Sequence, residues 1–308
     1  MREAAGKRLR VGDLFGGLAG AAVALPQSMG LGVVLFAAMG LSASAGALAG
    51  LIGAAALSLV SGIAGYTRGM ISAPNGPVTM LLSASLVAIG AEGVSSSGLV
   101  LALAALVMLA GLIQLIIGLT GGGQLIKFIP YPMVAGLVTA IGILMMRSQL
   151  QPLLPMFDAG IPTAWVWVPA ATAALTFAAI KLAPHLLPSV PGVVVGLVVG
   201  LAGFHLAAAM APMPVPDAWV VGAIPKLDDI RLDIDWDGFD ELPWELLFPA
   251  AAALAVLASI DCLVTAVVAD SATGGRHNAR GELAAQGVGQ MLAGLLGGIG
   301  GGGTKGST

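Results

Sequence analysis

Charged side chains are scarce in this sequence. Only 9% of its 308 residues are Asp, Glu, Lys or Arg, whereas 57% are hydrophobic. A soluble domain carries roughly 25% charged residues, which it needs to cover a surface that faces water. The composition therefore excludes an ordinary soluble domain and predicts a protein of the lipid bilayer.

Cysteine and histidine are also rare, and each shortage excludes a class of chemistry. The single cysteine, Cys262, excludes an internal disulfide. The three histidines, His185, His205 and His277, are not clustered, and the glycine runs lack the sequence context of a phosphate-binding loop. We therefore expect neither an enzyme nor an organic cofactor. A net charge of −3 without a basic patch likewise excludes a nucleic-acid partner.

Long apolar stretches are abundant, and their lengths are close to the ~20 residues needed to cross hydrocarbon. They occupy residues 12–37, 42–62, 98–120, 128–146, 164–182, 190–210, 246–269 and 282–298. Backbone in a bilayer must satisfy its hydrogen bonds within the segment or a closed barrel, and helices do so segment by segment. The sequence therefore predicts an all-α polytopic membrane protein.

The basic residues predict the orientation, because Lys and Arg of short loops stay on the cytoplasmic side. With residues 1–11 placed inside, nine basic residues fall inside and three outside, while Lys305 is unassigned. This count requires residues 74–90 to run from mid-membrane to the outside. We expect a multi-pass protein of the inner or plasma membrane with a cytoplasmic N-terminus.

The stretch "ISAPNGPVTM", residues 71–80, interrupts an apolar run with two prolines and a glycine. Pro77 suits a first helical turn, because its missing N–H would be unbonded there in any case. One interpretation is a half-helix that begins at mid-membrane and directs its positive end toward an anionic substrate. The alternative is an ordinary proline kink, and this stretch alone supports both equally.

A second interruption favours the half-helix. At residues 297–308, "GGIGGGGTKGST", an apolar stretch again gives way to glycine and then to hydroxyl residues. Each interruption follows two spans, and by the orientation count the first half begins inside and the second outside. Matching interruptions in two halves indicate an inverted-repeat transporter whose site lies between the repeats.

The loop between the halves, residues 211–245, is acidic and carries nine of the sixteen Asp and Glu residues. Its spacing does not match a calcium-binding loop, so we interpret it as a solvated extracytoplasmic linker. Trp236 and Trp244 are typical of a segment that lies at the membrane interface.

Asp261 lies near the middle of the span 246–269, and Thr265 follows one turn later on the same helix face. An ionisable group at this depth is costly, and it indicates a functional site with a partner or a cation. The alternative is a structural carboxylate bonded to a neighbouring helix.

Three stretches, "GDLFGGLAGAAVALPQSMGLG", "TRGMISAPNGPVTM" and "SIDCLVTAVVADSATGGRHNARGELAAQGVGQMLAGLLGGIGG", resemble the SulP family of anion transporters, the sulfate permease family. The resemblance runs from Gly12 to Thr308. It implies two inverted halves of seven segments, with discontinuous third and tenth segments, a homodimer and a cytoplasmic STAS domain. Residues 12–210 are then the first repeat and 246–308 the start of the second. The chain ends inside the tenth segment, so a fragment lacking the STAS domain is the expectation.

The resemblance also implies site residues. The anion is expected between the starts of the third and tenth segments, and the residues concerned are Gln27, Ser28, Pro77, Val78, Thr79, Gly303 and Thr304. The sequence is similar to the sodium-dependent bicarbonate branch, in which Asp261, Thr265 and Gly303 correspond to a sodium site. Lys305 departs from that branch, which has a threonine there, and an ammonium group is a candidate substitute for the cation.

Substrate and coupling stay open at this stage. Half-helix termini favour an anion without distinguishing bicarbonate from sulfate or a dicarboxylate, and symport with sodium, symport with protons and exchange all fit a buried carboxylate. The rival function is a channel-like or motor member of the same family. No arginine ladder supports it.

Overall fold

The computed structural model describes residues 11–122, 165–187, 192–211 and 236–304, with the isolated positions 136, 139, 140, 143, 146, 190, 215 and 234. These residues belong to two units, which are described separately. The first comprises residues 1–23 and 142–220, and the second comprises residues 24–141 and 221–308.

Helices make up nearly all of the described structure. They are α1 (Val11–Ala38), α2 (Ala43–Ala64), α3 (Gly76–Ala91), α4 (Ser96–Thr120), α6 (Val168–Leu186), α7 (Gly192–Met210), α8 (Trp244–Thr273) and α9 (Ala279–Leu295), with the short 3-10 helix η5 (Trp236–Glu241). Two strands of two residues each, β1 (Ser72–Ala73) and β2 (Gly302–Gly303), are paired. The predicted all-α class is confirmed.

Five of the described helices are long and apolar enough to cross a membrane, namely α2, α4, α7, α8 and the Gly16–Ala38 part of α1. Helix α3, with 16 residues, is a shorter apolar helix. The predicted span 128–146 lies almost wholly outside the described residues, as does most of the linker 211–245.

The span predicted at 282–298 needs a correction. Helix α9 has 17 residues and ends at Leu295. Gly297 then adopts a positive φ of 79°, which glycine reaches without a side-chain clash, and the chain turns into the extended run that leads to β2. The apolar pattern continues past the helix to the buried Ile299, so hydrophobicity alone placed the boundary too late.

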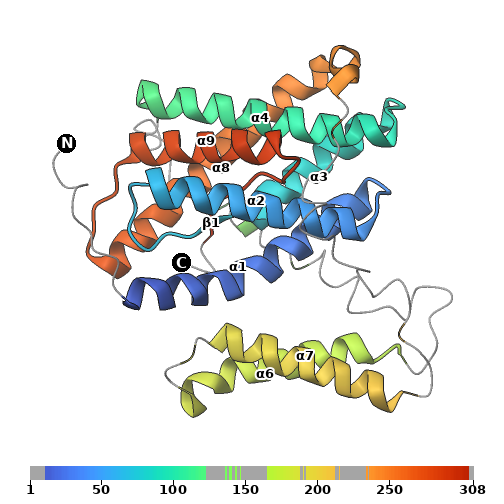
Figure 1. The fold of residues 1–308 in the computed structure, drawn as a ribbon, viewed down its shortest axis with the longest axis vertical. Coiled ribbons are helices and arrows are strands. Elements are labelled where there is room, and N and C mark those ends of the chain that lie inside the picture. The colour runs from blue at the N-terminus through green and yellow to red at the C-terminus, as the bar shows by residue number, and fades with distance from the viewer. Residues whose placement is uncertain are drawn as a thin grey trace. The chain divides into compact units, whose positions relative to one another are not determined.

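In the first unit, α6 and α7 lie side by side as a helical hairpin (Figure 1). Small residues allow the close approach, since a methyl group at Gly196 would overlap the side chain of Ile180. The buried ring of Trp165 has its centroid 6.3 Å from that of Phe204 on α7.

In the second unit, α9 lies between α4 and α2, and α8 packs against α3 and α4 (Figure 1). The core is aliphatic and joins helices from distant parts of the sequence. Its fully buried members include Leu82 and Leu86 of α3, Leu103 and Leu106 of α4, and Leu247 and Leu254 of α8. This packing holds α3 and α8 together, and both contribute to the site.

Polar side chains define where the helices of this unit begin. Ser42 accepts a hydrogen bond from the N–H of Ala45 at the start of α2, and Ser95 accepts one from Gly98 at the start of α4. Such caps satisfy N–H groups that have no partner within the helix. Asn75 caps the start of α3 in the same way, but this cap is buried, whereas Ser42 and Ser95 are not.

Candidate functional site

The two interruptions of the sequence meet. Strands β1 and β2 pair antiparallel, with Ser72 opposite Gly303 and Ala73 opposite Gly302. The N–H of Thr304 extends the pairing by donating to the carbonyl of Ile71 at 2.8 Å. Figure 1 shows β1 in the middle of the unit, with α2, α8 and α3 around it. The breaks are therefore two halves of one feature, since each extended segment satisfies the other's backbone groups.

Helix α3 begins directly after this crossing. Asn75 is its N-cap, and its side-chain oxygen accepts a hydrogen bond from the N–H of Val78 at 3.2 Å. The N–H of Thr79 donates to the carbonyl of Asn75 at 3.0 Å. The helix start predicted at Pro77 is confirmed. However, the first-turn N–H groups are not all open, because Asn75 occupies the one at Val78.

Asp261 lies beside this helix start. Its carboxylate is 7% exposed, and its Oδ2 accepts a hydrogen bond from Nδ2 of Asn75 at 2.8 Å. Asn75 therefore joins the first turn of α3 to the carboxylate of α8 with its two amide atoms. A buried carboxylate requires such partners, because an isolated charge in an apolar interior is strongly destabilised.

Thr265 connects α8 to the second break. Its hydroxyl lies 2.8 Å from the carbonyl oxygen of Asp261 and 3.1 Å from that of Gly303. The carboxylate of Asp261, this hydroxyl and the Gly303 carbonyl are oxygen donors, the type that small hard cations prefer. The donor set thus fits the sodium ion that the resemblance implies.

Thr79 differs from its neighbours in having an unused hydroxyl. It is 1% exposed, and its Oγ1 has no hydrogen-bond partner among the described residues. A buried hydroxyl without a partner is costly, by about 1–3 kcal/mol. Thr79 stands in the first turn of α3, near the positive end of the helix dipole. Its hydroxyl is therefore available for a ligand.

The other predicted anion-site residues are in several environments. Pro77 is half-buried in the first turn of α3, while Thr304 is 3% exposed and its hydroxyl lies 3.1 Å from the carbonyl oxygen of Ile71. In α1, Ser28 is fully buried and donates to the carbonyl of Ala24 at 2.7 Å, whereas Gln27 is exposed. Lys305 lies outside the described residues.

Sequence reasoning missed Glu282, which anchors the segment that descends to β1. It is fully buried, and its Oε2 accepts hydrogen bonds from the N–H of Tyr66 at 2.7 Å and from the hydroxyl of Thr67 at 2.8 Å. Gln286, one turn later, donates from Nε2 to the hydroxyl oxygen of Ser72 in β1. A polar residue every fourth position along an otherwise apolar stretch was the available signal.

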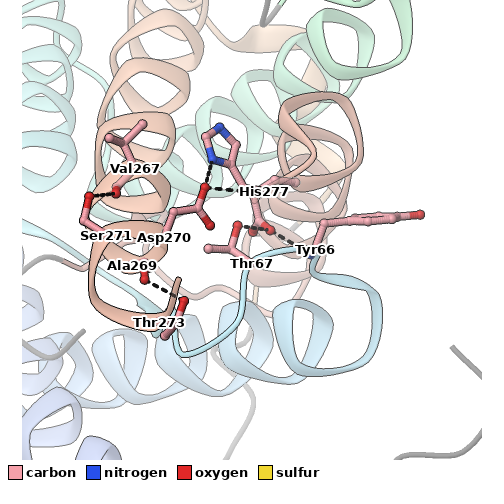
Figure 2. Close-up of polar contacts among 9 residues, drawn as sticks. Tyr66, Thr67, Val267, Ala269, Asp270, Ser271, Thr273 and His277 are labelled. Carbon is pink, nitrogen blue, oxygen red and sulfur yellow. Dashed lines mark hydrogen bonds and ion pairs between the residues drawn. The ribbon is translucent and has the colours of Figure 1, made fainter. Parts of the chain in front are cut away.

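Asp270 and His277 form a second polar pair at the C-terminal end of α8. The Oδ2 of Asp270 accepts from the backbone N–H of His277 at 2.9 Å and lies 2.6 Å from its Nδ1 (Figure 2). Figure 2 also labels Tyr66 and Thr67, the two residues that donate hydrogen bonds to Glu282. The pair ties the loop between α8 and α9 to the end of α8, just before α9 begins.

Comparison with known proteins agrees with this arrangement. The chain matches the sulfate permease family over residues 11–308. It belongs to that family. It is 34% identical over 310 residues to the bicarbonate transporter BicA of Picosynechococcus sp., an alignment that covers 95% of this chain and 51% of BicA. It is 25% identical to the putative sulfate transporter YvdB of Bacillus subtilis, covering 93% of this chain and 53% of YvdB.

Solved structures give the same result for the fold. The transmembrane domain of a cyanobacterial bicarbonate transporter BicA matches with a TM-score of 0.74 and 29% identity, over 96% of this chain and 75% of that one. A murine Solute Carrier 26 anion transporter in the inward-facing state matches with a TM-score of 0.71 at 16% identity, which shows the fold alone. The chain spans about half the length of the curated relatives that it matches. These relatives are named as transporters rather than enzymes.

Proposed function

We propose that this chain carries the anion site of a secondary transporter that moves bicarbonate or sulfate across the membrane by alternating access. The observation that supports it most is the crossing of β1 and β2 beside the start of α3. This crossing brings a helix N-terminus, with its partial positive charge, into the interior of a membrane protein. The relatives are named as a bicarbonate transporter and a putative sulfate transporter, which supports an anion at this place.

In this proposal the anion meets the first turn of α3. Thr79 offers a buried hydroxyl without another partner, and the helix dipole favours negative charge. The N–H of Val78 contributes only if the Asn75 side chain gives it up, since the two are hydrogen-bonded. Because Asn75 also donates to Asp261, anion binding and the state of that carboxylate are coupled through one side chain.

The proposal includes sodium at Asp261, Thr265 and Gly303. A bound sodium ion supplies a positive charge that offsets the buried carboxylate. The chain's own residues hold the oxygen donors in position, because Thr265 lies within hydrogen-bond distance of the Gly303 carbonyl while α8 carries both Asp261 and Thr265. A homodimer with a cytoplasmic N-terminus in the plasma membrane is also part of the proposal.

The test is uptake of labelled bicarbonate, sulfate and fumarate into proteoliposomes that contain the full-length protein, with sodium or choline outside. We expect saturable uptake of an inorganic anion that sodium stimulates. Uptake of none of the three would contradict the transport proposal, and channel-like flux without saturation would favour the rival function.

Sodium-independent uptake would instead favour the alternative that Lys305 substitutes for the cation. Lys305→Thr separates the two: under the lysine hypothesis it makes transport sodium-dependent or changes anion affinity. An unchanged variant would remove Lys305 from the mechanism.

A further inference from the structure

A groove of about 460 Å³ lies between α2, α4 and α9, at the end where α2 and α4 finish and α9 begins. Figure 1 shows these three helices side by side. The walls of the groove are mostly aliphatic: Val60, Ala64, Leu115, Leu119, Ala284 and Val288. An open apolar groove of this kind is a surface that an acyl chain can fill.

Apolar side chains are exposed both on the groove wall and next to it. Ile63 of α2 is 79% exposed and Leu119 of α4 is 69% exposed. In water such exposure would be costly, but in a bilayer these side chains lie in hydrocarbon. The exposure of these side chains therefore suits an acyl chain in the groove.

One end of the groove is cationic. Arg280, in the first turn of α9, lines it, and the guanidinium lies against Gly121, the C-cap of α4, where a methyl group would collide with it. The ring of Tyr66 packs against Gly281 beside it, so the phenol forms part of the same end. The groove thus combines an apolar trough with a polar head.

The charge of Arg280 has no partner among the described residues. Among the residues that the structure describes, no carboxylate lies within ion-pair distance of its guanidinium, and no side-chain hydrogen bond uses its five N–H donors. Two further arginines are exposed: Arg68 lies in the loop after α2, and Arg276 lies in the loop between α8 and α9. A guanidinium with free donors recognises phosphate by paired hydrogen bonds.

We propose that this groove binds an anionic phospholipid, with an acyl chain along the walls formed by α2, α4 and α9 and the headgroup phosphate on Arg280. The apolar trough requires a chain, and the unmatched cation at its end requires a negative head. By the orientation count from the sequence, Arg280 lies on the cytoplasmic side, where basic residues attract anionic lipid. The site is separate from the crossing of β1 and β2 and does not depend on the transport proposal.

The experiment is native mass spectrometry of the purified chain in detergent, titrated with phosphatidylglycerol or phosphatidylcholine of the same acyl chains. We expect tighter binding of phosphatidylglycerol. Arg280→Gln should weaken it about fivefold, the effect of one basic residue at an anionic surface. Arg276→Gln is the matched control, because this exposed arginine lies in the loop just before α9 but does not line the groove, and it should change the affinity less than twofold.

A second variant tests the apolar part. Ala64→Trp adds a large ring at an exposed position on the groove wall and should reduce the binding of both lipids. Equal affinity for the two lipids, or an Arg280→Gln variant that behaves as the wild type, would overturn the proposal. So would two other outcomes: Ala64→Trp changing the oligomeric state while lipid binding persists, or inorganic phosphate stabilising the chain against heat as well as phosphatidylglycerol does.

Discussion

Replacing Asp261 with asparagine tests the cation site directly. The variant keeps the size of the side chain and can still accept the hydrogen bond from Asn75, but it removes the buried negative charge. Removing one partner of a buried charge pair costs about 3–5 kcal/mol. Sodium affinity should therefore fall by a factor of at least about 100, since each ~1.4 kcal/mol is tenfold.

This loss can be read as a change in sodium-dependent stability. At a sodium concentration about 100 times its Kd, binding stabilises the folded protein by about 2.7 kcal/mol. After a hundredfold loss of affinity the same concentration equals the Kd, and the stabilisation falls to about 0.4 kcal/mol. We expect the rise in Tm between choline and sodium to shrink to about one sixth in Asp261→Asn.

The assay is thermal unfolding of the purified protein in sodium and in choline at equal ionic strength. Glu245→Gln is the control, because this carboxylate is on the same helix, α8, but is exposed in its first turn. It should keep the full sodium effect. An Asp261→Asn variant that sodium stabilises as much as the wild type would refute the assignment of Asp261 to a cation site.

Three further outcomes are expected. Gly53→Ala should lower stability by about 1–3 kcal/mol because its methyl group would overlap the carbonyl of Ile299, whereas Gly62→Ala, in open space on the same helix, should be neutral or stabilising in the same unfolding assay. Glu282→Gln should lower stability by about 1.5–3 kcal/mol and speed proteolysis within residues 65–71, and unchanged digestion would contradict its anchoring role. Thr79→Val should leave Tm unchanged or higher yet weaken bicarbonate or sulfate binding measured by calorimetry; unchanged affinity would remove its hydroxyl from the anion site.

The location of the first break could be predicted because its signals are local. Pro77 fixes its own φ and restricts the residue before it, and the helix starts where it predicts. The glycine run at residues 297–303 was a local signal too, although the end of α9 was placed too late because the apolar pattern continues beyond it to Ile299. Composition was sufficient for the all-α membrane class, since few other structures tolerate so little charge.

The polar contacts of the site could not be predicted, because they join residues far apart in the sequence. Asn75 and Asp261 are separated by 186 positions, and Glu282 and Tyr66 by 216. Asn75 carried a recognisable capping signal before Pro77. The capping rule, however, predicts a hydrogen bond only for its side-chain oxygen and none for its side-chain nitrogen. Its second bond, to the carboxylate, follows from the packing of α3 against α8, and no periodicity in one sequence reveals that.

The glycines around the crossing allow the backbones of the two breaks to pack directly against each other. A methyl group at Gly301 would overlap the carbonyl of Ala73, and one at Gly53 would overlap the carbonyl of Ile299. Backbone thus lies directly on backbone, from α2 through the glycine run to β1, and the N–H of Ile299 donates to the carbonyl of Ala49 at 3.1 Å. This close packing predicts that a shift of the segment before β2 also shifts β1, which lies next to the Asn75 cap of α3. In the proposed transporter the anion and cation sites would both adjoin this crossing, so variants that loosen it should weaken both sites at once.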